Sequence, residues 1–129
     1  MALMESGEMY LESILVLSRE RDRVRAVDVG EYLSVSKPAV SRALSRLKDG
    51  EYVAVDADGN IALSVSGREI AEKILERHSL LSEMFIRLGV DRETAVADAC
   101  KIEHDLSEET FAALKRHMLR SGTDRTETR

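Results

Sequence analysis

Residues 26–63 read AVDVGEYLSVSKPAVSRALSRLKDGEYVAVDADGNIAL, and this stretch determines the fold that the sequence predicts. Its apolar residues recur first at helical spacing and then in two short runs on either side of the turn-forming cluster Asp56-Ala57-Asp58-Gly59-Asn60. The expected elements are a helix over 26–33, a turn at Ser34-Val35-Ser36, a helix from there to about Lys48, and strands at 52–55 and 61–63. A helix, a tight turn, a second helix and a hairpin in this order are typical of a winged helix-turn-helix.

The helix that ends near Lys48 has clear boundaries in the sequence. Ser36 can cap its first turn, and Pro38, the only proline of the chain, is tolerated there because the first amides of a helix have no helical acceptor. Asp49-Gly50 ends the helix. The residues expected to be buried beneath it are Val40, Ala43, Leu44 and Leu47.

The flanking sequence predicts further helices. They cover 8–21, 66–88, 92–104 and about 107–120. Ser66-Gly67-Arg68-Glu69 has the spacing of a capping box at the start of the longest helix, and Gly89 ends it. The sequence therefore predicts a mainly α chain. The expected parts are a winged helix-turn-helix domain with a two-stranded wing over 1–65, a helical domain over 66–120, and a disordered polar tail over 121–129.

The composition restricts the class of protein. The 129 residues, of which 43% are apolar, suit one compact unit or two small subdomains, and they exclude a multidomain enzyme. With two Phe and no Trp, the interior must be filled mainly by aliphatic side chains, which favours helix packing. Cys100 is the only cysteine, and no apolar run is long enough for a signal peptide or a membrane span. We expect a cytoplasmic protein with a reduced cysteine and no membrane partner.

The charge is distributed unevenly along the chain. The net charge is −5, but residues 19–48 contain eight cationic and four anionic side chains, a net +4. A basic segment in an acidic chain predicts double-stranded DNA as a partner, because phosphates are neutralised by cations. On charge alone, an ordinary solvated helix surface explains the pattern equally well.

The second helix of a winged helix-turn-helix enters the major groove of DNA. Its outward residues here are small or cationic, so they can approach bases and phosphates: Lys37, Pro38, Ser41, Arg42 and Ser45. We expect Arg42 to read a base, because its guanidinium can bond bidentately to guanine. The residues expected to hold phosphates are Ser36, Ser41, Arg46 and Lys48. The alternatives are that Ser36 is only a helix cap and that Arg46 is only a solvated residue.

A second group of reactive side chains lies in the segment Cys100-Lys101-Ile102-Glu103-His104. Positions i, i+3 and i+4 share one face of a helix, so the thiol, the carboxylate and the imidazole are expected to converge and to invite a divalent metal. The alternative is that Cys100 is a small core residue and that Glu103 and His104 form a solvated edge.

Four separated segments make the chain resemble a family of metal-activated bacterial repressors, which includes the diphtheria toxin repressor and the manganese transport regulator. The segments are Glu8-Met9-Tyr10-Leu11-Glu12, Ser36–Gly50, Arg77-His78 with Leu80-Leu81, and Ala99-Cys100 with Glu103-His104-Asp105-Leu106. The resemblance covers nearly the whole chain. It implies a winged-helix DNA-binding domain, a helical metal-binding and dimerisation domain, and metal bound between them.

The resemblance also implies a set of metal ligands. The matching residues are Met9, Glu12, His78, Cys100, Glu103 and His104. Met9, Cys100, Glu103 and His104 match the ligand set of the iron-sensing branch of the family. Glu12 and His78 match ligands of the manganese-sensing branch, in which acidic residues replace Met9 and Cys100. The chain is therefore a hybrid of the two branches.

The donor atoms favour one ion over the other. A thioether and a thiolate gain more with iron(II) than with manganese(II), which prefers oxygen donors and stands lowest in the divalent affinity series. We therefore expect iron(II) as the favoured ion and manganese(II) as the alternative. Ser82 and Val96 stand where the larger iron sensors have accessory ligands, and no SH3-like domain is expected, so the length is that of the manganese type.

The expected function is that of a transcriptional repressor, a homodimer that binds operator DNA when loaded with metal and controls metal-uptake genes. Two alternatives belong to other classes. A metal-independent winged-helix regulator would respond to a small ligand or to oxidation of Cys100. A metalloenzyme would need an open coordination position and a general base, and the sequence offers neither a spare convergent His or Glu nor enough chain for a substrate cavity.

Overall fold

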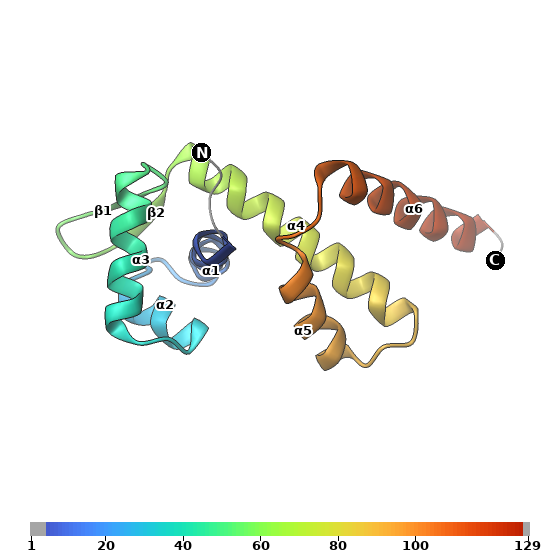
Figure 1. Cartoon of the computed structure of the whole chain (residues 1–129), viewed down its shortest axis with the longest axis horizontal. Helices are drawn as coiled ribbons and strands as arrows, with labels where there is room; N and C mark the ends of the chain where they lie inside the picture. The colour runs from blue at the N-terminus through green and yellow to red at the C-terminus, as the bar shows by residue number, and fades with distance from the viewer. Residues whose placement is uncertain (1–4, 128–129) are drawn as a thin grey trace. The chain divides into compact units, whose positions relative to one another are not determined.

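The computed structural model describes residues 5–127, which form six helices and a two-stranded sheet (Figure 1). The elements are α1 (Glu5–Glu20), α2 (Ala26–Leu33), α3 (Lys37–Asp49), β1 (Val53–Val55), β2 (Ile61–Leu63), α4 (Val65–Arg87), α5 (Arg92–Ile102) and α6 (Glu108–Glu127). The predicted mainly α fold class is confirmed. None of these helices has the length and apolar character that crossing a bilayer requires. The chain divides into two compact units, Met1–Ile74 and Leu75–Arg129.

The first unit is held together by an aliphatic core. Helix α1 packs against α2, α3 and β2, while α3 also packs against α2 and β1. The buried side chains come from every one of these elements: Leu11, Ile14, Leu15, Leu17, Val29, Val40, Ala43, Leu44, Leu47, Val53 and Ile61. All four residues predicted to lie beneath the second helix of the helix-turn-helix are buried. Each fully buried Val, Leu or Ile side chain contributes about 1.5–3 kcal/mol, so this core stabilises the fold of the first unit.

Local hydrogen bonds set the turn between α2 and α3. Ser34 adopts a left-handed conformation with φ of 58°, and the amide of Val35 donates to the carbonyl of Gly30 at 3.0 Å. The Ser36 hydroxyl then accepts the amide of Ala39 at 3.3 Å, which confirms Ser36 as the cap of α3.

The wing is a short antiparallel hairpin with Val53 opposite Leu63 and Val55 opposite Ile61. A carboxylate oxygen of Asp56 accepts the amides of Asp58 and Asn60, each at 2.9 Å, and closes the turn. Gly59 supplies the positive φ of 84° that this turn requires. The predicted hairpin is therefore confirmed.

The start of α4 differs from the prediction. The Ser64 hydroxyl accepts the amide of Gly67 at 3.1 Å, so Ser64 caps the helix and Ser66 lies inside its first turn. The predicted capping box over Ser66–Glu69 is wrong. The physical reason is nonlocal, because the Ser64 hydroxyl also donates to the carbonyl of Tyr52 at 3.0 Å, beside the wing.

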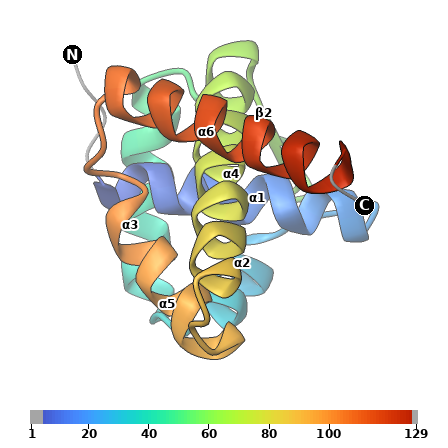
Figure 2. The same ribbon diagram turned by 90° about the vertical axis from the view of Figure 1, so that its right-hand side faces the viewer.

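The second unit contains the C-terminal part of α4 together with α5 and α6. Gly89 follows the end of α4. Helix α5 then runs back beside the C-terminal part of α4 in both views (Figures 1 and 2). Side chains cap the next two helices: a carboxylate oxygen of Asp91 accepts the amide of Glu93, and the hydroxyl of Ser107 accepts the amide of Thr110. The buried side chains described in this unit are more polar than those of the first unit: Arg77, Leu81, Ser82, Ala95, Ala99, Glu103, Phe111 and Met118.

The last helix is longer than predicted. It continues past Arg120 to Glu127, so residues 121–127, expected to be a disordered tail, are helical, whereas 128–129 lie outside the described residues. Gly122 is the strongest helix-breaking residue of this stretch, and one glycine inside a helix costs only about 1 kcal/mol.

Gly67 offers a test of how the first turn of α4 packs. A Cβ atom added there would clash with the carbonyl oxygen of Tyr52. We predict that Gly67→Ala lowers the free energy of unfolding by about 1–3 kcal/mol, because the backbone must shift to relieve this contact. Urea unfolding measures the change, and the exposed neighbour provides a control, since Ser66→Ala should change the value by less than about 0.5 kcal/mol. An unchanged value for Gly67→Ala would show that the two segments do not approach so closely.

Candidate metal centre and nucleic-acid interface

Glu103 is a carboxylate in the interior of the second unit. Its side chain is fully buried. One carboxylate oxygen, Oε2, lies 2.9 Å from Nδ1 of His78. The other, Oε1, has no hydrogen-bond partner within the described part of the chain. Burying a charged group costs several kcal/mol unless the charge is compensated. The environment of Oε1 therefore favours the arrival of a cation.

His104 approaches the same carboxylate from a second direction. Its side chain is 2% exposed, and its Nε2 atom lies 3.4 Å from Oε1 of Glu103 in a contact that lacks hydrogen-bond geometry. A nitrogen atom of an imidazole thus stands at each oxygen of one buried carboxylate. Carboxylate and imidazole groups are common ligands of divalent transition metals, so the donor set fits such an ion.

The end of α5 positions two of these three side chains. Glu103 is the C-cap of α5, and His104 lies in the turn that follows. The helix predicted to reach His104 therefore ends two residues early, at Ile102. The carbonyl of Glu103 accepts Nη1 of Arg77 at 3.1 Å instead of a helical amide, and the amide of Asp105 closes a tight turn onto Ile102.

Cys100 lies in a different environment from Glu103 and His104. It is exposed on α5, next to the fully buried Ala99. Of the three residues expected to converge, the structure brings Glu103 and His104 together, whereas Cys100 is at the surface of the second unit. Its exposure contradicts the alternative interpretation as a small core residue.

The remaining predicted ligands belong to the first unit. Met9 and Glu12 are partly buried residues of α1, three positions apart and therefore on one face of that helix. Their assignment as ligands stays a prediction.

Arg77 is a buried cation that the sequence analysis did not assign. Its side chain is 5% exposed, and the guanidinium lies 5.3 Å above the centre of the Phe111 ring. A signal for it does exist in the sequence. Arg77 stands three residues after Ile74 and four before Leu81, both of which are buried, so a cation occupies a core position of the helical pattern.

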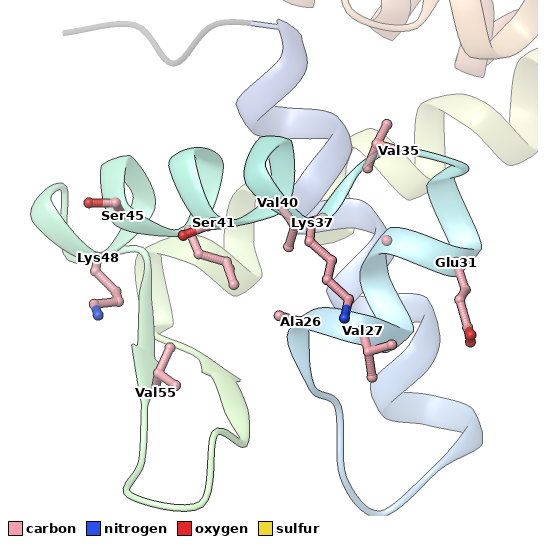
Figure 3. Close-up of a pocket in the computed structure, with 12 residues that line it drawn as sticks. Ala26, Val27, Glu31, Val35, Lys37, Val40, Ser41, Ser45, Lys48 and Val55 are labelled. Atoms are coloured by element: carbon pink, nitrogen blue, oxygen red, sulfur yellow. The ribbon is translucent and has the colours of Figure 1, made fainter.

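The candidate nucleic-acid interface lies on the first unit. A groove of about 930 Å³ is bounded by α2, α3 and β1, and Figure 3 shows Lys37, Ser41 and Lys48 on the groove side of α3. Pro38, Arg42 and Arg46 are also exposed, and at 100° per residue they form a second stripe beside the first. Every residue predicted to contact DNA is thus on an exposed face of α3 or at its start, although the cap bond of Ser36 shows that its hydroxyl has a structural role.

The groove also contains apolar residues that sequence reasoning missed. Val27 and Val35 line it from α2 and the following turn, and Val55 lines it from β1. Val27 is 50% exposed. Periodicity alone does not identify it, because the buried face of so short a helix is fixed only by its tertiary partners.

Two sequence-family descriptions match this chain. The iron-dependent repressor N-terminal DNA-binding domain matches residues 2–61, and the iron-dependent repressor metal-binding and dimerisation domain matches residues 64–125. The chain belongs to the iron-dependent repressor family. Members of this family are metal-dependent transcriptional repressors and not enzymes.

Individual relatives support the same assignment. The transcriptional regulator MntR of Geobacillus kaustophilus is 33% identical over 102 residues, which are 79% of this chain and 72% of the relative. An uncharacterised helix-turn-helix regulator of Methanocaldococcus jannaschii is 34% identical over 113 residues, 86% of this chain and 90% of the relative. The solved structure of the manganese regulator SloR is 25% identical with a TM-score of 0.79, and the match covers 87% of this chain but 53% of SloR. The chain spans about half the length of that structure.

The buried carboxylate leads to a prediction for the metal-free protein. Glu103→Gln should raise the free energy of unfolding by on the order of 1 kcal/mol, because the amide can keep the contact with His78 without burying a charge. Urea unfolding in the presence of a chelator measures this change. Adding manganese(II) without the chelator should stabilise the wild-type protein and leave the variant unchanged.

Glu83→Gln is the matched control, since this exposed carboxylate of α4 pairs with Arg87 on the surface. It should behave like the wild-type protein under both conditions. If Glu103→Gln unfolded the metal-free protein, the carboxylate would be a structural partner of His78 and not a ligand kept for a cation.

Proposed function

We propose that this chain represses transcription as a homodimer that binds operator DNA when it is loaded with iron(II) or manganese(II). The regulated genes would be those of metal uptake, and the protein would act in the cytoplasm. The observation that carries this proposal is the fully buried Glu103, with one oxygen facing Nδ1 of His78 and the other facing Nε2 of His104.

The proposed ligand set combines both units. Glu103, His78 and His104 would form its core, and Met9, Glu12 and Cys100 would complete it. When bound, a divalent ion supplies the positive charge that compensates the buried carboxylate. The thioether and the thiol favour iron(II), which we propose as the preferred ion, with manganese(II) as the alternative.

The proposed coupling follows from which domain supplies each ligand. We propose that residues 1–65 form the DNA-binding domain and residues 66–120 the metal-binding and dimerisation domain. Without metal, the carboxylates of Glu12 and Glu103 would repel one another, so the ligands would not hold α1 against the helix that carries Cys100. Shared ligation would remove this repulsion and fix the DNA-binding domain. Linkage then requires DNA to tighten metal binding by the same factor as metal tightens DNA binding.

A homodimer is proposed because each chain presents one recognition helix. Two recognition helices read two half-sites only when their separation matches one turn of DNA, about 34 Å, or a multiple of it. The helices after Ser66 would provide the dimer contact. A monomer at micromolar concentration in analytical ultracentrifugation, with and without metal, would contradict this assignment.

The metal preference can be tested by exchanging the soft donors. The double variant Met9→Asp with Cys100→Glu supplies oxygen ligands, and activation of DNA binding should shift toward manganese(II) and away from iron(II). The measurement is anaerobic fluorescence anisotropy on a duplex selected from random sequence by the metal-loaded protein, at controlled free concentrations of each ion. A thermal melt checks that the variant folds. A folded double variant with the metal ranking of the wild-type protein would remove Met9 and Cys100 from the ligand set.

The DNA contacts can be tested with two substitutions on α3. Arg42→Ala should weaken binding to the selected duplex by about 1–3 kcal/mol and relax the preference for one base pair, because a bidentate base contact is lost. Lys48→Ala should weaken binding to all sequences alike and reduce the salt dependence, as expected for a phosphate contact. Uniform loss in the Arg42 variant would reassign Arg42 to a phosphate.

A further inference from the structure

Arg77 makes three contacts that meet at the turn between α5 and α6. Its Nη1 atom donates to the carbonyl of Glu103 at 3.1 Å and to the carbonyl of Leu106 at 2.7 Å. Its guanidinium lies 5.3 Å above the ring of Phe111, in the first turn of α6. The side chain is 5% exposed, so water does not compete for these contacts.

These contacts determine where two proposed ligands stand. The two carbonyls bracket the turn that contains Glu103 and His104, and the bond to the first carbonyl replaces a helical hydrogen bond at the point where α5 ends. Arg77 also precedes His78 in α4, so the residue that holds the turn is covalently attached to the third ligand. A planar guanidinium can bond two carbonyls and stack on a ring at once, which a lysine ammonium cannot do.

We propose that Arg77 is the positioning residue of the metal centre. By holding the carbonyls of Glu103 and Leu106 and packing on Phe111, it aims Glu103 and His104 at His78 and thereby sets the affinity for the divalent ion. This inference rests on the proposed function of the same site.

Electrostatic repulsion alone predicts the opposite change in metal affinity when Arg77 is replaced, so the two explanations can be distinguished. A buried guanidinium next to a cation site repels the incoming ion, so removal of its charge would tighten metal binding if electrostatics dominated. If positioning dominates, removal of Arg77 misplaces two ligands and weakens binding. Residues that orient metal ligands typically change affinity by about 10–100-fold when they are mutated.

The experiment measures manganese(II) binding by isothermal titration calorimetry for the wild-type protein and three variants. Arg77→Met removes the charge and the hydrogen bonds at similar length, and Arg77→Lys keeps the charge without the planar group. Lys115→Met is the matched control, because Lys115 also links α6 to α4, through Glu76, at an exposed position. Circular dichroism confirms that each variant is folded at the titration temperature.

We expect affinity to fall by about 10–100-fold in Arg77→Met, to fall also in Arg77→Lys, and to stay unchanged in Lys115→Met. The cobalt(II) absorption spectrum should change in both Arg77 variants, since it reports ligand geometry independently of DNA binding. A folded Arg77→Met variant that binds manganese(II) as tightly as the wild-type protein, or more tightly, would overturn the inference. Full recovery by Arg77→Lys would also overturn it, because charge rather than geometry would then be the cause.

Two other results would also be informative. If Arg77→Met does not fold, Phe111→Leu tests the same contact by removing the ring while keeping an apolar side chain. It should bind manganese(II) several-fold more weakly, and unchanged binding would overturn the inference. A wild-type protein that binds neither manganese(II) nor iron(II) would instead overturn the proposed function itself.

Discussion

The proposed metal centre depends on one carboxylate that water does not reach. Glu103 is fully buried, and within the described residues only one of its carboxylate oxygens has a hydrogen-bond partner, Nδ1 of His78. A protein selected only for stability would replace such a group by a neutral one, because the desolvation of a charge is costly. A cation bound at Oε1 would compensate this charge. The nearby imidazole of His104 and the turn held by Arg77 then have a common purpose.

The two units distribute stability and function differently. The first unit has a continuous aliphatic core, and α3, the proposed recognition helix, begins at a confirmed cap and is buried on one face only. Because one face of α3 is packed into this core, the helix is held in place and positions exposed side chains such as Arg42 and Lys48. The second unit buries charged and polar groups among aliphatic side chains. Departures from the usual rules of core composition are expected where a site is built, and here they coincide with the proposed metal centre.

Local signals were sufficient to predict most of the fold, and nonlocal contacts explain what they did not predict. The bounds of α2 and the cap of α3 follow from neighbouring residues, and both are confirmed. The cap of α4 is Ser64 and not the predicted Ser66, because the Ser64 hydroxyl bonds to the carbonyl of Tyr52, twelve residues away. The early end of α5 has a similar cause, since the carbonyl of Glu103 bonds to Arg77, twenty-six residues away. Family resemblance pointed to His78, Glu103 and His104, but burial and atomic distances could come only from the folded chain.

The most direct test of the account is the position of a bound ion. Crystals of the protein loaded anaerobically with manganese(II) or iron(II) locate the ion by anomalous diffraction at the edge of that metal. We expect a peak within bonding distance of Oε1 of Glu103, with at least one imidazole nitrogen of His78 or His104 as a further ligand. A peak elsewhere, with Glu103 outside the coordination shell, would contradict the account.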